Sequence, residues 1–259
     1  MEDIKAETSP SESEDPLFSI VTPTYNAAET VEKTIASILG QEGDIGVVEH
    51  LIQDGGSTDA TLELLKKYPH LKVVSESDDG IYDAMNRGIA RAKGRYIAVL
   101  NADDVYEPHT LKLVRAAFEV DEEVGLVHGD MNLVDGEKVL KRWKPVAWKR
   151  LYRMWVGHAT CVVRREIYEE HGNFNLRYPE QADYDLITRL RTAGVKFTYI
   201  PEVLTNFLVG GFSAQNWSFR DSVEIRRKDG HPWPWAVFTS LVNRYYFVLR
   251  LKWNEIRSR

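Results

Sequence analysis

Short apolar runs alternate with segments of helical periodicity between residues 18 and 128. The apolar runs predict strands, and apolar residues three or four positions apart predict helices. The predicted strands span 18–23, 47–52, 72–75, 95–100 and 125–128. The predicted helices span 30–39, 60–68, 81–92 and 108–118. Strands that alternate with helices form parallel sheets with helices on both faces, so the pattern predicts an α/β, doubly wound fold.

Polar residues follow three of the predicted strands at the point where each strand ends. They are Thr22, Pro23, Thr24, Tyr25 and Asn26 after the first strand, Asp54 after the second, and Asn101, Ala102, Asp103 and Asp104 after the fourth. Turn chemistry explains each cluster taken singly. Ligands of open α/β sheets, however, bind at the carboxyl ends of the strands. Three polar clusters at one edge therefore predict a ligand site.

The adjacent acids Asp103 and Asp104 need an explanation of their own. Two neighbouring carboxylates cost desolvation and repulsion unless a positive group lies between them. A divalent metal that carries a diphosphate would supply that charge. On this stretch alone, a polar turn explains the residues equally well.

Charge and composition narrow the function. Residues 1–16 hold six acidic residues and one lysine, so this predicted disordered tail carries five of the six net negative charges. The remainder is nearly neutral, which argues against nucleic-acid binding. The single Cys161 excludes an internal disulfide, and the first residues lack the features of a secretory signal. We therefore expect a cytoplasmic protein.

Four motifs occur in order along the first half of the chain. They read SIVTPTYN at 19–26, QDGGSTD at 53–59, SESDDGIYDAMN at 75–86 and LNADD at 100–104. This series resembles the family 2 glycosyltransferases of the GT-A fold, particularly bacterial members that build surface polysaccharides. The resemblance covers about residues 17–215. It implies a GT-A-type, mostly parallel sheet, with a nucleotide-sugar-binding half over 17–125 and an acceptor-binding half over 126–230.

The resemblance also implies a role for each motif residue. The expected contacts to a nucleotide-sugar, with a UDP-sugar favoured, are Thr22, Pro23, Thr24, Tyr25, Asn26, Asp54, Asp83, Asn101 and Ala102. Tyr25 would stack on the base and Asp54 would help to hold it, although many relatives carry a second acid where this chain has Gly55. Asp103 and Asp104 would ligate Mg²⁺ or Mn²⁺. Asn101 replaces the first acid of the usual D-x-D pattern and is expected at the ribose.

The predicted catalytic base is Asp183, at the start of a helical stripe. Helix capping is the simpler explanation of an acid at this position. In the resembled family, an acid here removes the proton of the acceptor hydroxyl, and a single displacement inverts the anomeric carbon. Asp185 is expected to be structural or an acceptor contact. His158 is as well explained by a structural role as by a place in the site.

The second half of the chain contains two aromatic segments. Trp143, Trp148, Tyr152 and Trp155 lie among basic residues and predict either an irregular cover for the sheet or a groove for an anionic acceptor. Beyond a strand at 196–200, residues 204–208 lead to a flexible turn at 210–213 and a helix at 214–228. Residues 231–259 combine Trp and Tyr with five basic residues and one acid. This composition suits a helix at a membrane surface, or one packed on the domain or on a second subunit.

The expected acceptor is a saccharide, with one linked to polyprenyl diphosphate favoured by the resemblance and by residues 231–259. Two other classes of function stay open. A nucleotidyltransferase would also use strand-end acids and a metal, but residues 22–26 contain no Lys or Arg for the phosphates. A catalytically silent scaffold that binds partners through its C-terminal helix is the second alternative.

Overall fold

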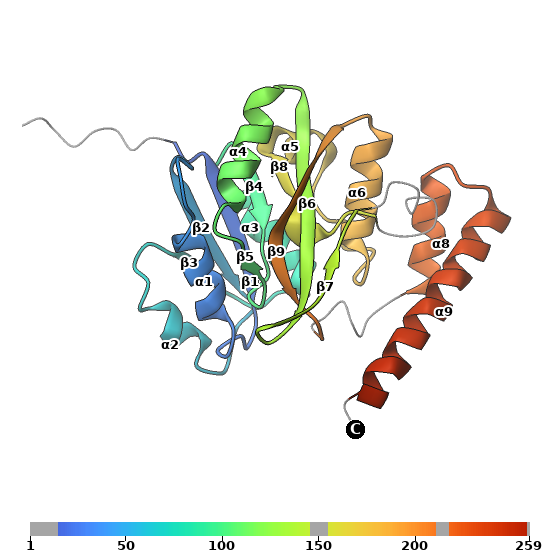
Figure 1. Cartoon of the computed structure of the whole chain (residues 1–259), viewed down its shortest axis with the longest axis horizontal. Helices are drawn as coiled ribbons and strands as arrows, with labels where there is room; N and C mark the ends of the chain where they lie inside the picture. The colour runs from blue at the N-terminus through green and yellow to red at the C-terminus, as the bar shows by residue number, and fades with distance from the viewer. Residues whose placement is uncertain (1–14, 146–154, 211–217, 258–259) are drawn as a thin grey trace, which may run out of the picture.

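One curled sheet with helices on both faces forms the body of the protein (Figure 1). The computed structural model describes residues 15–145, 155–210 and 218–257, with side chains described up to residue 245. Within these residues the strand order is β3-β2-β1-β4-β8-β6-β9-β5, and β7 pairs with β6. The predicted α/β architecture is confirmed.

The first half of the chain forms the parallel part of the sheet. Its strands are β1 (Phe18–Thr24), β2 (Val48–Asp54), β3 (Lys72–Ser75) and β4 (Tyr96–Val99), joined by α1 (Val31–Leu39), α2 (Thr61–Leu65) and α3 (Ile81–Arg91). The register aligns Thr24 with Asp54, and Asp54 with Ser75. The ends of three strands therefore meet at one edge, as the motif spacing predicted.

The second half makes the sheet mixed. Its elements are β5 (Val105–Tyr106), α4 (Thr110–Val120), β6 (Val124–Asp135), β7 (Lys138–Trp143), β8 (Val162–Arg164), α5 (Arg165–His171), α6 (Ala182–Thr192) and β9 (Lys196–Leu208). Strand β8 is antiparallel to β4 and β6, whereas β6 and β9 run parallel along most of their length.

Two sequence expectations about this half are wrong. The strand predicted at 125–128 continues to residue 135, and the one predicted at 196–200 continues to 208. The segment up to Trp143, which the sequence predicted as an irregular cover for the sheet, therefore forms the regular strands β6 and β7. Polar residues interrupt the apolar pattern here, but the ladder between β6 and β9 holds the backbone extended. Residues 148 and 152 lie outside the described residues.

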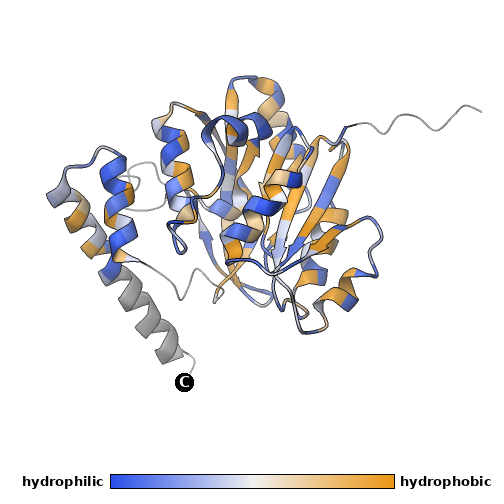
Figure 2. Ribbon diagram, turned by 180° about the vertical axis from the view of Figure 1, so that it is seen from behind, coloured by the Kyte–Doolittle hydropathy of each residue, from blue (hydrophilic) through white to orange (hydrophobic). Residues whose placement is uncertain are grey.

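Alternation along the strands divides the core into two layers. Val21 of β1 and Ile97 of β4 pack with α3, α5 and α6, whereas Ile20 and Ala98 pack with α1 and α4 on the other face. Successive side chains of a strand point to opposite faces, so strands covered on both sides are largely apolar, although β2 also buries Glu49 and His50. Figure 2 shows largely hydrophobic strands covered by helices with mixed surfaces.

Two helices at the C-terminal end, α8 (Phe219–Lys228) and α9 (Trp233–Arg257), pack against each other beside α6 (Figure 1). Tyr178 donates its hydroxyl hydrogen to Glu224 of α8 over 2.8 Å, and Arg191 of α6 pairs with Asp229. Of the turn predicted at 210–213 and the helix predicted at 214–228, residues 211–217 lie outside the described residues, as do residues 1–14 of the predicted tail. No helix in the described part has the length and apolar character needed to cross a bilayer.

Candidate functional site

Hydrogen bonds join the loops that follow β1 and β2 at the carboxyl edge of the sheet. Asn26 accepts hydrogen bonds on Oδ1 from the backbone N–H groups of Thr58 (2.8 Å) and Asp59 (3.3 Å), and its own N–H donates to Ser57 Oγ (2.8 Å). Its backbone φ of 49° lies in the left-handed region, which Asn tolerates better than most residues. The predicted contact residue Asn26 therefore fixes one loop on the next.

Asp54 connects these loops to β3. Its fully buried carboxylate accepts hydrogen bonds from Thr24 Oγ1 (3.0 Å), Ser75 Oγ (2.7 Å), the backbone N–H groups of Gly56 (3.0 Å) and Ser57 (2.9 Å), and Ser57 Oγ (2.5 Å). Burial alone would raise the pKa of Asp54, but the hydrogen bonds from Ser57, Ser75 and Thr24 bring it below its usual value. Both oxygens thus have internal partners, and direct contact with a base stays a prediction.

Tyr25 and Asn26 are the exposed residues of the first motif, and Tyr25 is its one aromatic side chain. Two-thirds of the surface of Tyr25 is exposed, whereas Thr22, Pro23 and Thr24 are buried. Thr22 Oγ1 lies 2.9 Å from Nε2 of the buried His50. An exposed aromatic ring beside a strand end can stack on a nucleobase, while the buried threonines hold the strand end in place. Only the exposed face of this motif is open to a ligand.

The loop between β3 and α3 has its own internal contacts. Asp83 accepts a hydrogen bond from the Asp79 backbone N–H over 3.1 Å and forms an ion pair with Arg87 over 2.7 Å. Arg87 also donates to the Ser77 carbonyl over 2.9 Å. These partners give Asp83 a structural role in shaping the loop, and its predicted contact with a nucleoside is untested.

The acids after β4 differ in exposure. Asp104 is fully buried, its Oδ1 accepts from the Leu208 N–H over 3.2 Å, and its backbone carbonyl accepts from Thr34 Oγ1 over 2.8 Å. Asp103 is half-buried. Burial raises the pKa of both carboxyl groups, and the nearby charge of Asp103 raises that of Asp104 further. The two side chains are therefore close enough to repel each other.

A divalent cation bound beside the two carboxylates would offset this repulsion. Oδ2 of Asp104 and Oδ1 of Asn101 are buried without a hydrogen-bond partner, and oxygen atoms of this kind are the ligands of Mg²⁺ and Mn²⁺. Across the described ranges, no group of three or more His, Cys, Asp and Glu side chains is placed to hold a metal. A bound ion would therefore need oxygen ligands from a substrate or water.

Asp183 lies in the first turn of α6 and contacts α3. Its Oδ1 accepts a hydrogen bond from the Tyr82 hydroxyl over 3.0 Å and from the Tyr184 N–H over 2.8 Å. Burial, together with the negative charge of Asp183, raises the pKa of Tyr82 well above 10, so this hydroxyl stays protonated and donates. No local sequence pattern selects Tyr82, because the contact joins residues 101 positions apart.

His158 and Asp185 differ in their relation to Asp183. His158 begins a short 3₁₀ helix, η2 (His158–Thr160), where burial lowers its pKa and the Asp183 charge opposes that shift. Asp185 is buried and paired with Arg189 over 2.8 Å, which gives it a structural partner. Of the aromatic residues predicted to line an acceptor groove, Trp155 stacks on Phe197 at 5.8 Å and packs against the core.

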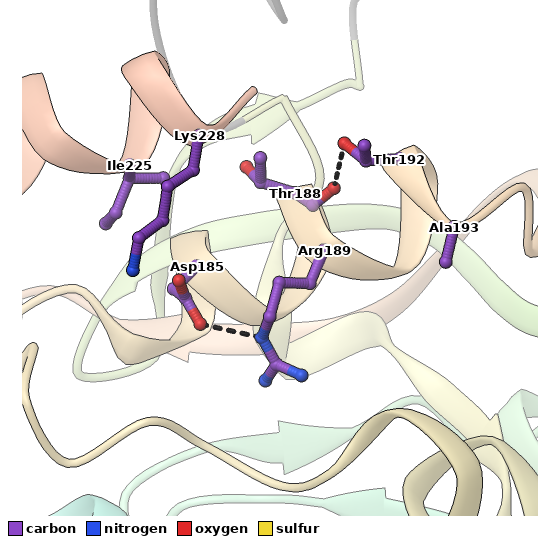
Figure 3. Close-up of a pocket in the computed structure, with 7 residues that line it drawn as sticks. All are labelled: Asp185, Thr188, Arg189, Thr192, Ala193, Ile225 and Lys228. Atoms are coloured by element: carbon purple, nitrogen blue, oxygen red, sulfur yellow. Dashed lines mark hydrogen bonds and ion pairs between the residues drawn. The ribbon is translucent and has the colours of Figure 1, made fainter. Parts of the chain in front are cut away.

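A pocket of about 300 Å³ lies between α6 and α8 (Figure 3). Its lining residues are Asp185, Thr188, Arg189, Thr192, Ala193, Ile225 and Lys228. At 100° per residue, the α6 members of this set fall on the side of the helix opposite Asp183. The pocket is therefore separate from the candidate site at the strand ends.

Known proteins with similar sequences share one activity class. A family model described as "Glycosyl transferase family 2" matches residues 19–177. A PGL/p-HBAD biosynthesis glycosyltransferase of Mycobacterium bovis (strain BCG / Pasteur 1173P2) is 34% identical over 187 residues, which cover 67% of this chain and 69% of that protein. Chondroitin synthase of Pasteurella multocida (strain Pm70) is 28% identical over 204 residues, which cover 76% of this chain and 21% of the synthase.

Solved structures show the same fold. S. aureus TarS 1–349 in complex with UDP-GlcNAc aligns with a TM-score of 0.65 and 17% identity, over 82% of this chain and 65% of that one. The mannosyltransferase PcManGT of Pyrobaculum calidifontis, in complex with GDP-Man and Mn²⁺, aligns with a TM-score of 0.61 and 20% identity, over 91% of this chain and 76% of that one. These likenesses confirm the predicted GT-A-type fold.

Proposed function

Because the chain belongs to glycosyl transferase family 2, we propose that it transfers a sugar from a nucleotide-sugar donor to a hydroxyl group of a saccharide acceptor in glycan or polysaccharide biosynthesis. The observation that supports this proposal is that the exposed Tyr25 follows β1, the acid pair Asp103 and Asp104 follows β4, and Asp183 accepts a hydrogen bond from the first turn of α3, the helix after β3. An aromatic surface, a site for cations and a candidate base are the three groups that such a transfer needs.

Support for a nucleotide-sugar donor comes from related proteins and from the strand ends. TarS was crystallised with UDP-GlcNAc, and PcManGT with GDP-Man and Mn²⁺. In this chain Tyr25 would stack on the base, while Asp103 and Asp104 would hold Mg²⁺ or Mn²⁺. A bound divalent ion would neutralise the charge of the diphosphate leaving group. The fit of Asp103 and Asp104 rests on their mutual repulsion and on the unpartnered oxygen of Asp104.

Asp183 is the proposed general base of an inverting displacement. The acceptor oxygen attacks the anomeric carbon, the bond from that carbon to the diphosphate oxygen breaks, and the hydroxyl proton passes to Asp183. Tyr82 and the Tyr184 N–H hold one carboxylate oxygen, Oδ1, and orient the other for the acceptor. No covalent sugar–enzyme intermediate is needed, in contrast to a retaining glycosidase.

Product analysis tests this function against its alternatives. A panel of sugar nucleotides is incubated with saccharide acceptors, with and without Mn²⁺. Sugar transfer releases nucleoside diphosphate, nucleotidyl transfer releases pyrophosphate, and a silent scaffold releases neither. Asp183→Asn should abolish transfer, whereas Glu166→Gln, the same acid-to-amide change at an exposed position on α5, should not. Full activity of Asp183→Asn would remove the base assignment.

We further propose that α9 brings the enzyme to an anionic membrane on which a lipid-linked acceptor, such as a polyprenyl-diphosphate sugar, is held. Trp235, Phe238, Leu241 and Tyr245 are 41–63% exposed and lie three or four positions apart, so they form one apolar stripe. The opposite face, with Ala236 and Ser240, is buried. An apolar stripe beside basic residues is the pattern of a helix at a membrane surface, here on the cytoplasmic side.

Vesicle flotation tests the membrane proposal. The double change Phe238→Gln and Leu241→Gln should reduce flotation with vesicles that contain anionic lipid. Val120→Gln, at an 87% exposed position on α4, should leave flotation unchanged. If the double variant floats normally but loses a dimer in sedimentation, α9 serves instead as the contact of a homo-oligomer.

A further inference from the structure

Gly55 lies at the end of β2, directly after Asp54, and the neighbouring loop fills the space beside it. A Cβ atom added to Gly55 would lie 2.6 Å from Oδ2 of Asp78 and 3.2 Å from its Cγ. Gly55 does not have a positive φ, so its backbone conformation does not require glycine. The carboxylate of Asp78 therefore occupies the space that a side chain at position 55 would take, and it would have to move to admit one.

The Asp78 carboxylate has a defined orientation. Its Oδ1 accepts a hydrogen bond from the Gly80 N–H over 2.9 Å, which leaves Oδ2 as the oxygen beside Gly55. The contacts of Asp83 with Asp79 and Arg87 fix the rest of this loop. Asp78 itself is only partly buried, so Oδ2 can receive a donor from a ligand.

We propose that Asp78 supplies, from the loop before α3, the carboxylate that a second acid at position 55 would provide, and that its Oδ2 accepts an N–H of the donor's base. This inference rests on the proposed function, because it assigns the base-reading residue of the same donor site. The Gly55 N–H donates to the Thr24 carbonyl over 2.8 Å, so the exposed Tyr25 directly follows the residue that lies beside Gly55.

The hydrogen-bonding capacity of Asp78 selects among the bases. Uracil presents one imide N–H between two carbonyl groups, which matches one available carboxylate oxygen. Guanine presents two adjacent donors that suit both oxygens of a carboxylate, but Gly80 occupies Oδ1. Adenine and cytosine place a ring nitrogen acceptor at the corresponding position, which would repel a carboxylate. The geometry therefore favours a uridine nucleotide.

Isothermal titration of the full-length protein with UDP, GDP, ADP and CDP, in the presence of Mn²⁺, tests this inference. Wild-type protein should bind UDP most tightly. Asp78→Asn should weaken UDP binding about tenfold to hundredfold, the range of a hydrogen bond to a charged group, and change GDP binding much less. Asp79→Asn, at the exposed neighbouring position, is the matched control and should bind UDP as the wild type does.

A double variant separates base reading from loop structure. Gly55→Asp alone should weaken UDP binding, because its side chain meets the Asp78 carboxylate. Gly55→Asp combined with Asp78→Gly should recover binding relative to either single change, since one carboxylate again lies beside the base. Thermal unfolding of each variant checks that it is folded.

Three results overturn the inference. They are a UDP affinity of Asp78→Asn equal to that of the wild type, an equal loss of affinity for all four nucleotides in that variant, and a double variant that binds UDP no better than Gly55→Asp. The first two leave the proposed glycosyltransferase function in place, because wild-type protein still binds UDP. Failure of wild-type protein to bind any nucleotide diphosphate would instead overturn the proposed function, and the inference with it.

Discussion

Replacing Asp54 by Asn or Ala tests whether this buried acid organises the site or contacts the ligand. Its carboxylate holds three chain segments together, through Thr24 of β1, Ser75 of β3 and the backbone N–H groups of Gly56 and Ser57. In Asp54→Asn the amide nitrogen can replace only Oδ1, because Oδ2 faces two backbone donors. The hydroxyl groups of Thr24 and Ser57 can rotate to accept, but the charge is lost.

The expected loss of stability in each variant follows from these contacts. Hydrogen bonds to a charged group contribute about 1.5–3 kcal/mol each and are not additive, so Asp54→Asn should lower the free energy of unfolding by about 2–3 kcal/mol. Asp54→Ala leaves two backbone donors without an acceptor and should cost about 3–5 kcal/mol. For a domain of this size, 1 kcal/mol corresponds to about 2–4 °C in melting temperature.

Stability and ligand affinity must be measured on the same variants. Urea unfolding at pH 7 gives the free energy of unfolding, and calorimetric titration with UDP gives the affinity. If Asp54 acts by holding the loops, both quantities fall together. An Asp54→Asn variant that keeps wild-type stability but loses UDP binding would refute this reasoning and restore Asp54 as a direct base contact. Glu29→Gln, an acid-to-amide change at an exposed position in the segment after β1, is the control.

Three further predictions concern Tyr82, His128 and the acid pair. Tyr82→Phe removes the hydrogen bond that orients Asp183, so kcat should fall about tenfold while the donor KM stays unchanged in steady-state assays. Burial, opposed by the Asp130 charge, lowers the pKa of His128 to about 4, so the stability it contributes is full above pH 6.5 and is lost as pH falls toward 4. At pH 5 the free energy of unfolding should be lower by about 2 kcal/mol than above pH 6.5. His128 lies within an aromatic cluster, so His128→Phe should keep the packing and remove this part of the pH dependence of urea unfolding. Chelation with EDTA should abolish sugar transfer. Added Mn²⁺ should restore the activity of the wild-type enzyme but not that of the Asp103→Ala variant.

The sequence predicted the half of the fold in which local pattern and topology agree. Each of the first three strands is followed by a helix and ends at a polar motif, so the meeting of Thr24, Asp54 and Ser75 at one edge follows from the parallel order alone. The long pairing of β6 with β9 could not be predicted from the sequence pattern. Polar residues such as Asp130 and Asn132 interrupt the apolar pattern there, and only the partner strand keeps them extended.

Contacts between distant segments limited the prediction of the site. The bond between Tyr82 and Asp183 joins two helices whose packing no local pattern encodes. The proximity of Asp78 to Gly55 likewise depends on how the β3–α3 loop folds back over the end of β2. Motif spacing could place these residues at the same edge of the sheet, but it could not pair them.

Burial divides the acids of the motifs into two sets. Asp54 accepts hydrogen bonds from its own chain on both carboxylate oxygens, and Asp83 pairs with Arg87, whereas Asp104 accepts one on Oδ1 and keeps Oδ2 without a partner. Asp78 and Asp103 retain exposure at the edge of the sheet. A carboxylate already held by internal donors gains little from a ligand and loses stability if it must turn toward one. Direct recognition of the donor is therefore expected from the second set, with the first set fixing the loops on which that recognition depends.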